Sequence, residues 1–122
     1  MPVIVNQNLS IQPTGSSARV TVELDVVWDA HERRAGQEYL LRVEMWGEDG
    51  TIFDPDNRLF SFGFPFLTDG SEVQRLRNTT LVPLRDLNED SGPDEVYARL
   101  SLTPTRSFGT ATARTNTVRE RF

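Results

Sequence analysis

The chain has 122 residues, which suits a single domain, and a formal net charge of −5 from 18 acidic and 13 basic side chains. It contains no cysteine and one histidine, which excludes disulfides and thiolate metal sites. The acidic balance argues against a general nucleic-acid-binding protein, because such a protein needs an excess of cations to neutralise phosphates.

Most of the sequence alternates between apolar and polar residues, which is the period of a half-buried β-strand. The clearest case runs from Val20 to Trp28, where every second residue is apolar. No stretch has helical periodicity over three turns, so the sequence predicts an all-β protein. In chain order we expect strands at 2–11, 18–29, 38–47, 51–53, 58–67, 72–84, 95–103 and 108–120.

Turn-forming residues separate these ranges. Asp49-Gly50 and Asp69-Gly70 are two-residue hairpin signals, because both residue types tolerate a positive φ. Seven to eight short strands in a chain of this length are typical of an antiparallel β-sandwich with immunoglobulin-like or fibronectin-III-like architecture. We therefore predict one such domain over residues 1–122.

One face of the strand predicted at 58–67 carries four phenylalanines, which are Phe60, Phe62, Phe64 and Phe66. We expect these rings in the core, because buried rings contribute large apolar areas. The alternative is an exposed aromatic ledge for a partner. Pro65 cannot donate a hydrogen bond to a sheet, so this strand should lie at an edge. If Asp69-Gly70 closes a hairpin, the next strand needs a bulge near Gln74 and Arg75 to bring its apolar residues to one face.

The sequence offers little for catalysis. His31 is the single histidine and lies in a predicted turn, and no Gly-x-Ser-x-Gly nucleophile motif accompanies it. A glycine-rich phosphate loop is also missing. Neighbouring carboxylates such as Glu23 and Asp25 fit the solvent-facing positions of a strand better than a glycosidase site, which needs a cleft. We therefore predict that the protein is not an enzyme.

Two predicted loops are acidic and could bind Ca²⁺, which takes about six to eight oxygen ligands. In the expected topology both loops lie at the same end of the sandwich. The candidate ligands are Asp49, Asp54, Asp56, Asn57, Asp86, Asp90 and Asp94. The alternative is that these residues form solvated turns, in which Asp and Asn are common. We expect no other cofactor.

The outward-facing residues favour a protein that functions by binding a partner or a second copy of itself. Val27, Leu40 and Trp46 would form one apolar patch if their two strands are neighbours. Arg33 and Arg34 lie at the end opposite the acidic loops, which suggests a head-to-tail contact between copies. The leading hypothesis is a non-enzymatic interaction or assembly module that binds a protein partner or itself, and not nucleic acid.

Two other functions remain open. The first is calcium-dependent binding of a ligand or surface through the acidic loops. The second is a carbohydrate-binding module, in which an aromatic ring stacks on a sugar. The alternation points Trp28 and Tyr39 inward, so Trp46 is the candidate ring.

Sequence composition also bears on location and source. No apolar run is long enough to span a membrane, and the first residues lack the pattern of a signal peptide, so we expect a cytoplasmic protein. Every basic residue is arginine, as is typical of GC-rich genomes, and we expect a bacterial or phage source.

Overall fold

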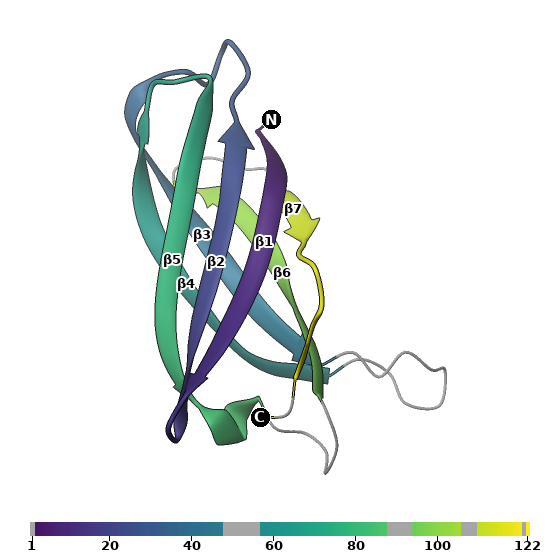
Figure 1. The fold of residues 1–122 in the computed structure, drawn as a ribbon. Helices are drawn as coiled ribbons and strands as arrows, with labels where there is room; N and C mark the ends of the chain where they lie inside the picture. Colours follow the sequence, from purple (N-terminus) through teal and green to yellow (C-terminus); the bar gives the residue numbers. More distant parts are fainter. Residues whose placement is uncertain (1, 48–56, 88–93, 106–109, 121) are drawn as a thin grey trace.

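Two antiparallel β-sheets pack face to face in the computed structural model, which describes residues 2–47, 57–87, 94–105, 110–120 and 122 (Figure 1). One sheet has the strand order β1-β2-β5, and the other has the order β4-β3-β6-β7 with β8 also paired to β6. These two packed antiparallel sheets confirm the predicted sandwich. The fourth strand lies beside the third, as strand C′ lies beside strand C in variable-type immunoglobulin sheets. The strands are β1 Val3–Thr14, β2 Ser17–Val27, β3 Ala35–Gly47, β4 Asn57–Asp69, β5 Val73–Pro83, β6 Asp94–Pro104, β7 Ala111–Arg114 and β8 Val118–Glu120.

A short 3₁₀ turn, η1 Leu84–Asp86, follows β5. In the described ranges no helix is long and apolar enough to cross a membrane.

The last predicted strand is in fact two strands. The prediction of one strand over 108–120 is wrong because β7 and β8 both pair with β6 and leave a gap between them. Thr115 fills this gap: its hydroxyl oxygen accepts the Ala98 N–H at 2.8 Å, and its own N–H donates to the Ala98 carbonyl at 2.9 Å. The predicted short strand at 51–53 lies outside the described residues.

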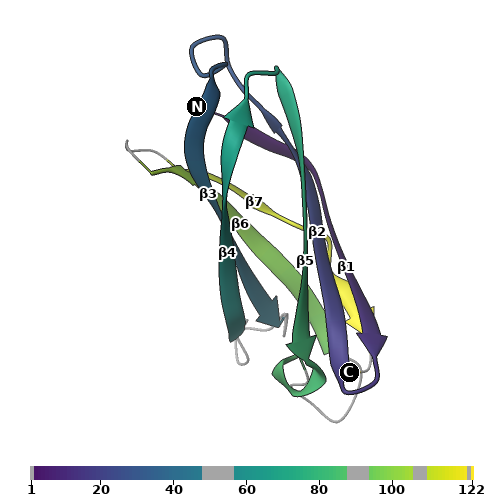
Figure 2. The same cartoon turned by 90° about the vertical axis from the view of Figure 1, so that its left-hand side faces the viewer.

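The expected hairpin at Asp69-Gly70 is wrong, although the turn itself is tight. Gly70 has a φ of 85°, and Asp69 Oδ1 accepts the Ser71 N–H at 2.9 Å. The turn leads from β4 in one sheet to β5 in the other (Figure 2). All 11 residues of β5 pair with β2 without a register shift, so the bulge expected near Gln74 and Arg75 is absent as well.

The core lies between the two sheets. Central residues of β2 and β3, such as Val22 and Val43, are fully buried. The four phenylalanines of β4 pack against this core, as predicted, but remain half-buried because β4 is an edge strand. The expected edge position of Pro65 is thereby confirmed.

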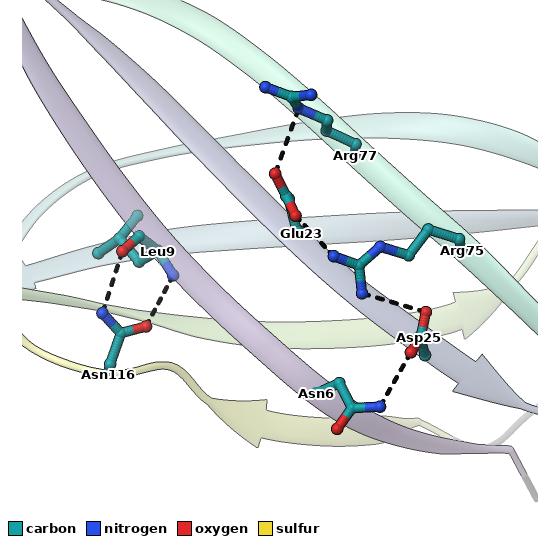
Figure 3. A network of polar contacts seen from close by, with 7 residues as sticks. All are labelled: Asn6, Leu9, Glu23, Asp25, Arg75, Arg77 and Asn116. Atoms are coloured by element: carbon teal, nitrogen blue, oxygen red, sulfur yellow. Dashed lines mark hydrogen bonds and ion pairs between the residues drawn. The ribbon is translucent and has the colours of Figure 1, made fainter.

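Polar and charged side chains connect the three strands on the outer face of the smaller sheet (Figure 3). Arg75 on β5 lies 2.6 Å from Glu23 Oε2 and 3.3 Å from Asp25 Oδ1, and Arg77 Nε lies 3.4 Å from Glu23 Oε1. Asp25 also accepts a hydrogen bond of 2.9 Å from Asn6 Nδ2. Asn6 has a φ of 54°, a conformation that asparagine tolerates better than most residues.

Acid should weaken this network. The hydrogen bond from Asn6, together with the Arg75 guanidinium, holds the pKa of Asp25 below its usual range. A lowered pKa means that ionised Asp25 stabilises the fold above its unfolded pKa of about 4, and that this contribution is lost as the pH falls through the folded pKa. We expect Asp25→Asn to lower the Tm at neutral pH, and we expect this difference from the wild type to shrink as the pH falls below about 4, as followed by circular dichroism. A difference that stays constant as the pH falls would contradict this role.

Candidate functional site

The acidic calcium candidates are only partly described. Gly47 pairs with Asn57 and with Val96, so the segments that flank both acidic loops meet at one end of the sandwich. Asp86 is exposed in η1, with its Oδ1 4.0 Å from Arg85 Nε. Within the ranges that the structure describes, no three His, Cys, Asp or Glu side chains gather as metal ligands do. The calcium site remains a prediction, because Asp49, Asp54, Asp56 and Asp90, and the side chains of Asn57 and Asp94, lie outside the described part.

The expected apolar patch of Val27, Leu40 and Trp46 does not form. Val27 is on β2 and the other two residues are on β3, and these strands belong to different sheets whose outer faces point in opposite directions. Val27 instead lies in register with Val3 and Val73 on the smaller sheet. The hypothesis depended on β2 and β3 pairing as neighbours, which alternation alone cannot test.

The end that carries Arg33 and Arg34 has no excess of arginine over acidic side chains in the part of the chain that the structure describes. Arg33 donates from Nε to the Trp28 carbonyl at 3.3 Å, and its Nη2 lies 3.3 Å from Glu72. Exposed Arg34 follows directly, and His31 donates its backbone N–H to Asp29. Among the described residues at this end, acidic side chains outnumber the two arginines, so their charge does not favour the head-to-tail contact. These acidic residues are Asp29, Glu32, Asp69 and Glu72.

Aromatic and arginine side chains gather on the outer face of the larger sheet. Trp46 of β3 lies opposite Tyr97 of β6. One row further, Glu44 lies opposite Arg99, which in turn lies opposite Arg114 of β7. This arginine–aromatic face comprises Arg42, Glu44, Trp46, Tyr97, Arg99 and Arg114.

Two guanidinium groups stack on the two rings of this face. Arg99 Cζ lies 4.1 Å from the centroid of the Trp46 ring, and Arg114 Cζ lies 3.6 Å from that of Tyr97. Arg99 also donates from Nη2 to the Tyr97 hydroxyl at 3.3 Å. Tyr97 points away from the core, yet it is completely buried beneath these arginines. Cation–π contacts of this kind contribute about 0.5–1 kcal/mol each and fix where the guanidinium groups lie.

Positive charge predominates on the face although the chain is acidic. Glu44 pairs with Arg58 of β4 at 3.6 Å. Arg42 and Arg99 are exposed, and neither has a carboxylate partner in the described part of the chain. Beside them lies a shallow depression of about 420 Å³ that combines guanidinium groups, hydroxyls and apolar atoms. It is lined by Glu44, Arg99, Leu100, Ser101, Thr112, Ala113 and Arg114.

Trp46 is not open to a sugar in the way a carbohydrate-binding module requires. The guanidinium of Arg99 covers its ring, and its Nε1 atom is buried without a hydrogen-bond partner among the described residues. Trp28 and Tyr39 are buried in the core, as predicted. A pyranose could stack on Trp46 only if Arg99 moved away.

Sequence reasoning missed Tyr97, Arg99 and Arg114. Alternation does place Trp46, Tyr97 and Arg99 on the outer sides of their strands. That these strands are neighbours, and in which register, depends on pairs separated by about half the chain. The arginine–aromatic face therefore becomes visible only in the folded protein.

Comparison with known proteins identifies the fold and no family. No family model matches the chain, and no curated protein matches it. A glycosyl hydrolase family 2 member from Bacteroides cellulosilyticus DSM 14838 is similar in structure, with a TM-score of 0.65 and 11% identity over 93% of this chain. The chain spans 14% of that protein's length. This likeness shows a shared β-sandwich fold alone.

Two weaker structural similarities were also found. Beta-glucosidase 3B from Thermotoga neapolitana in complex with alpha-D-glucose matches with a TM-score of 0.41 and 16% identity, over 99% of this chain and 17% of that one. CsgH from R. palustris matches with a TM-score of 0.40 and 17% identity, over 92% of this chain and 90% of that one. At these TM-scores neither likeness supports a conclusion about function.

Proposed function

We propose that this protein is a non-catalytic interaction module that binds an acidic segment of a protein partner through the arginine–aromatic face. One observation carries the proposal: Arg42 and Arg99 are exposed on this face without a carboxylate partner in the described ranges, in a chain of net charge −5. By contrast, Arg75 and Arg77 on the other sheet are paired with acids. Guanidinium groups bind carboxylates through two parallel hydrogen bonds, so this face suits aspartate and glutamate side chains.

The packing of the face supports a binding role. Because Arg99 and Arg114 already stack on Trp46 and Tyr97, a ligand would not have to order these two side chains on binding. Tryptophan, tyrosine and arginine are also the residues that contribute most to binding energy at protein interfaces. The hydroxyls of Ser101 and Thr112 border the same depression and add polar contacts.

The comparisons give no positive evidence of catalysis. The family 2 glycosyl hydrolase resembles this chain over 14% of its own length, and this likeness concerns the fold alone. Among the described residues, the arginine–aromatic face contains one carboxylate, Glu44, which Arg58 neutralises. A lone, paired carboxylate is poorly suited to general acid–base chemistry.

The direct test is a titration with hexaglutamate followed by NMR chemical shifts. We expect the shifts to be largest for the backbone amides of Arg42, Arg99 and Arg114. The double variant Arg42→Ala/Arg99→Ala should weaken binding about tenfold or more, because two charge-assisted contacts are removed. Arg19→Ala is the matched control, since Arg19 is an exposed arginine on the other sheet, and it should bind as the wild type does.

Four outcomes would overturn the proposal. In the first, hexaglutamate leaves all amide shifts unchanged up to millimolar concentration. In the second the shifts map to another surface, and in the third the double variant binds as tightly as Arg19→Ala. A single-stranded oligonucleotide that binds the face more tightly than hexaglutamate at the same ionic strength would identify a nucleic-acid interface instead.

A further inference from the structure

Among the described residues, strand β5 has a long and regular free edge. It pairs with β2 on one side over all 11 of its residues, and it has no proline before Pro83, its last residue. An edge strand of this kind is a template for another strand, so proteins usually shorten, kink or cover it.

The other edges in the described part of the sandwich are protected. Asn116 covers the edge of β1, where its side-chain amide bonds both the N–H and the carbonyl of Leu9 at 2.7 and 3.0 Å. Pro65 interrupts the edge of β4, and a register shift separates that strand from β3 near Trp46. Strands β7 and β8 contain four and three residues. Strand β5 is therefore the edge best suited to pairing.

The arginines of β5 do not guard its free edge. Arg75 and Arg77 reach toward β2, where Glu23 and Asp25 hold them at 2.6 to 3.4 Å (Figure 3). Charges that commonly repel an incoming strand are thus neutralised and drawn away from it. On the same outer face Leu81 is 64% exposed, so an apolar side chain remains uncovered.

Two β5 strands are complementary to each other when they run antiparallel. Full overlap of residues 73–83 places Asn78 at the two-fold axis, opposite Asn78 of the second copy. Arg75 then lies opposite Leu81 of the second copy, and Arg77 lies opposite Thr79. A shift of the centre to Arg77 would instead place two arginines against each other, which is unfavourable. The register with the most backbone pairing therefore places no like charges directly opposite each other.

The half-buried phenylalanines of β4 lie on the same open side of the sandwich. Figure 2 shows β4 and β5 side by side at the edges of their sheets. Gln74 connects the two strands by donating from Nε2 to the Leu67 carbonyl at 3.1 Å. A second copy that continues the sheet beyond β5 would cover the exposed parts of Phe60, Phe62 and Phe64.

We infer that two copies of this chain associate through antiparallel β5–β5 pairing, which joins their smaller sheets into one six-stranded sheet. The interface lies on the sheet opposite the arginine–aromatic face. The dimer is therefore independent of the proposed binding function, and each can fail without the other.

Cysteine crosslinking tests the register, because the chain has no cysteine of its own. In Asn78→Cys the two introduced residues would lie opposite each other, with Cα atoms about 4.5–5.5 Å apart, within the range of a disulfide. In Leu81→Cys they would lie about 20 Å apart, six residues along the paired strands. We expect Asn78→Cys to form a covalent dimer under mild oxidation and Leu81→Cys not to do so, although position 81 is more exposed.

Sedimentation of the cysteine-free chain provides the second measurement. The wild type should sediment as a dimer, and Asn78→Arg should raise its dissociation constant about tenfold, because it places two unpaired arginines directly opposite each other at the two-fold axis. Asn78→Gln is the matched control and should stay dimeric, and circular dichroism checks that each variant is folded. A wild type that remains monomeric up to millimolar concentration would overturn the inference. Faster crosslinking of Leu81→Cys than of Asn78→Cys would do so as well.

Discussion

Replacing Trp28 with alanine should lower the free energy of unfolding by about 3–5 kcal/mol, the range for removing a buried tryptophan. Trp28 follows directly after β2 and is 1% exposed. Its ring meets the ring of Tyr39 edge-on, with centroids 4.8 Å apart, so it connects the end of one sheet to the other. Truncation leaves a cavity that this strand end cannot close. Urea unfolding followed by circular dichroism measures the loss.

A second variant separates packing from hydrogen bonding at this position. Trp28 Nε1 has no hydrogen-bond partner among the described residues, so Trp28→Phe keeps an aromatic ring and gives up no such bond. We expect it to cost about 1–2 kcal/mol, well below the alanine variant. If the two variants are equally destabilised, the contact with Tyr39 is not what makes Trp28 important.

Replacing Asn116 with alanine should cost about 2–3 kcal/mol, because it leaves a backbone N–H and a carbonyl without partners. Asn116 lies between β7 and β8, and its part-buried amide bonds Leu9 N–H at 2.7 Å and the Leu9 carbonyl at 3.0 Å (Figure 3). The side chain thus takes the place of a neighbouring strand at the edge of β1. We expect a lower urea midpoint together with faster hydrogen exchange of the Leu9 amide.

The matched control for Asn116 lies on the same side of the sandwich. Gln7 Nε2 donates one exposed hydrogen bond of 3.0 Å to the Arg114 carbonyl. We expect Gln7→Ala to cost less than about 1 kcal/mol, because both freed groups can bond to water. Equal losses in the two variants would show that Asn116 acts as an ordinary surface contact.

The final stretch of the chain shows why local patterns locate strands better than they delimit them. The Thr-rich sequence after residue 110 is compatible with one continuous strand, and its apolar residues are too small to mark a break. The break at Thr115 exists because this side chain can reach the Ala98 N–H, and that contact depends on β6 lying alongside. A short-range pattern contains no information about such a partner.

The candidate site also shows what local patterns can and cannot predict. Alternation correctly places Trp46 on an outer face and Trp28 in the core, because the side-chain period of a strand is local. Alternation also predicts that the side chains of Val27 and Leu40 point outward. It cannot predict that they lie on opposite faces of the molecule, because that depends on which sheet each strand joins. The predicted patch failed for this reason, and the arginine–aromatic face was not foreseen.

The sequence by itself determined the all-β class, most strand positions, the inward phenylalanines and the edge position of Pro65. Each of these follows from periodicity or from the chemistry of one residue. Only the tertiary structure decided that the Asp69-Gly70 turn crosses between sheets, that β5 pairs with β2, and that Arg99 and Arg114 stack on Trp46 and Tyr97. These features depend on which distant strands become neighbours, and burial of both apolar faces in one core sets that choice.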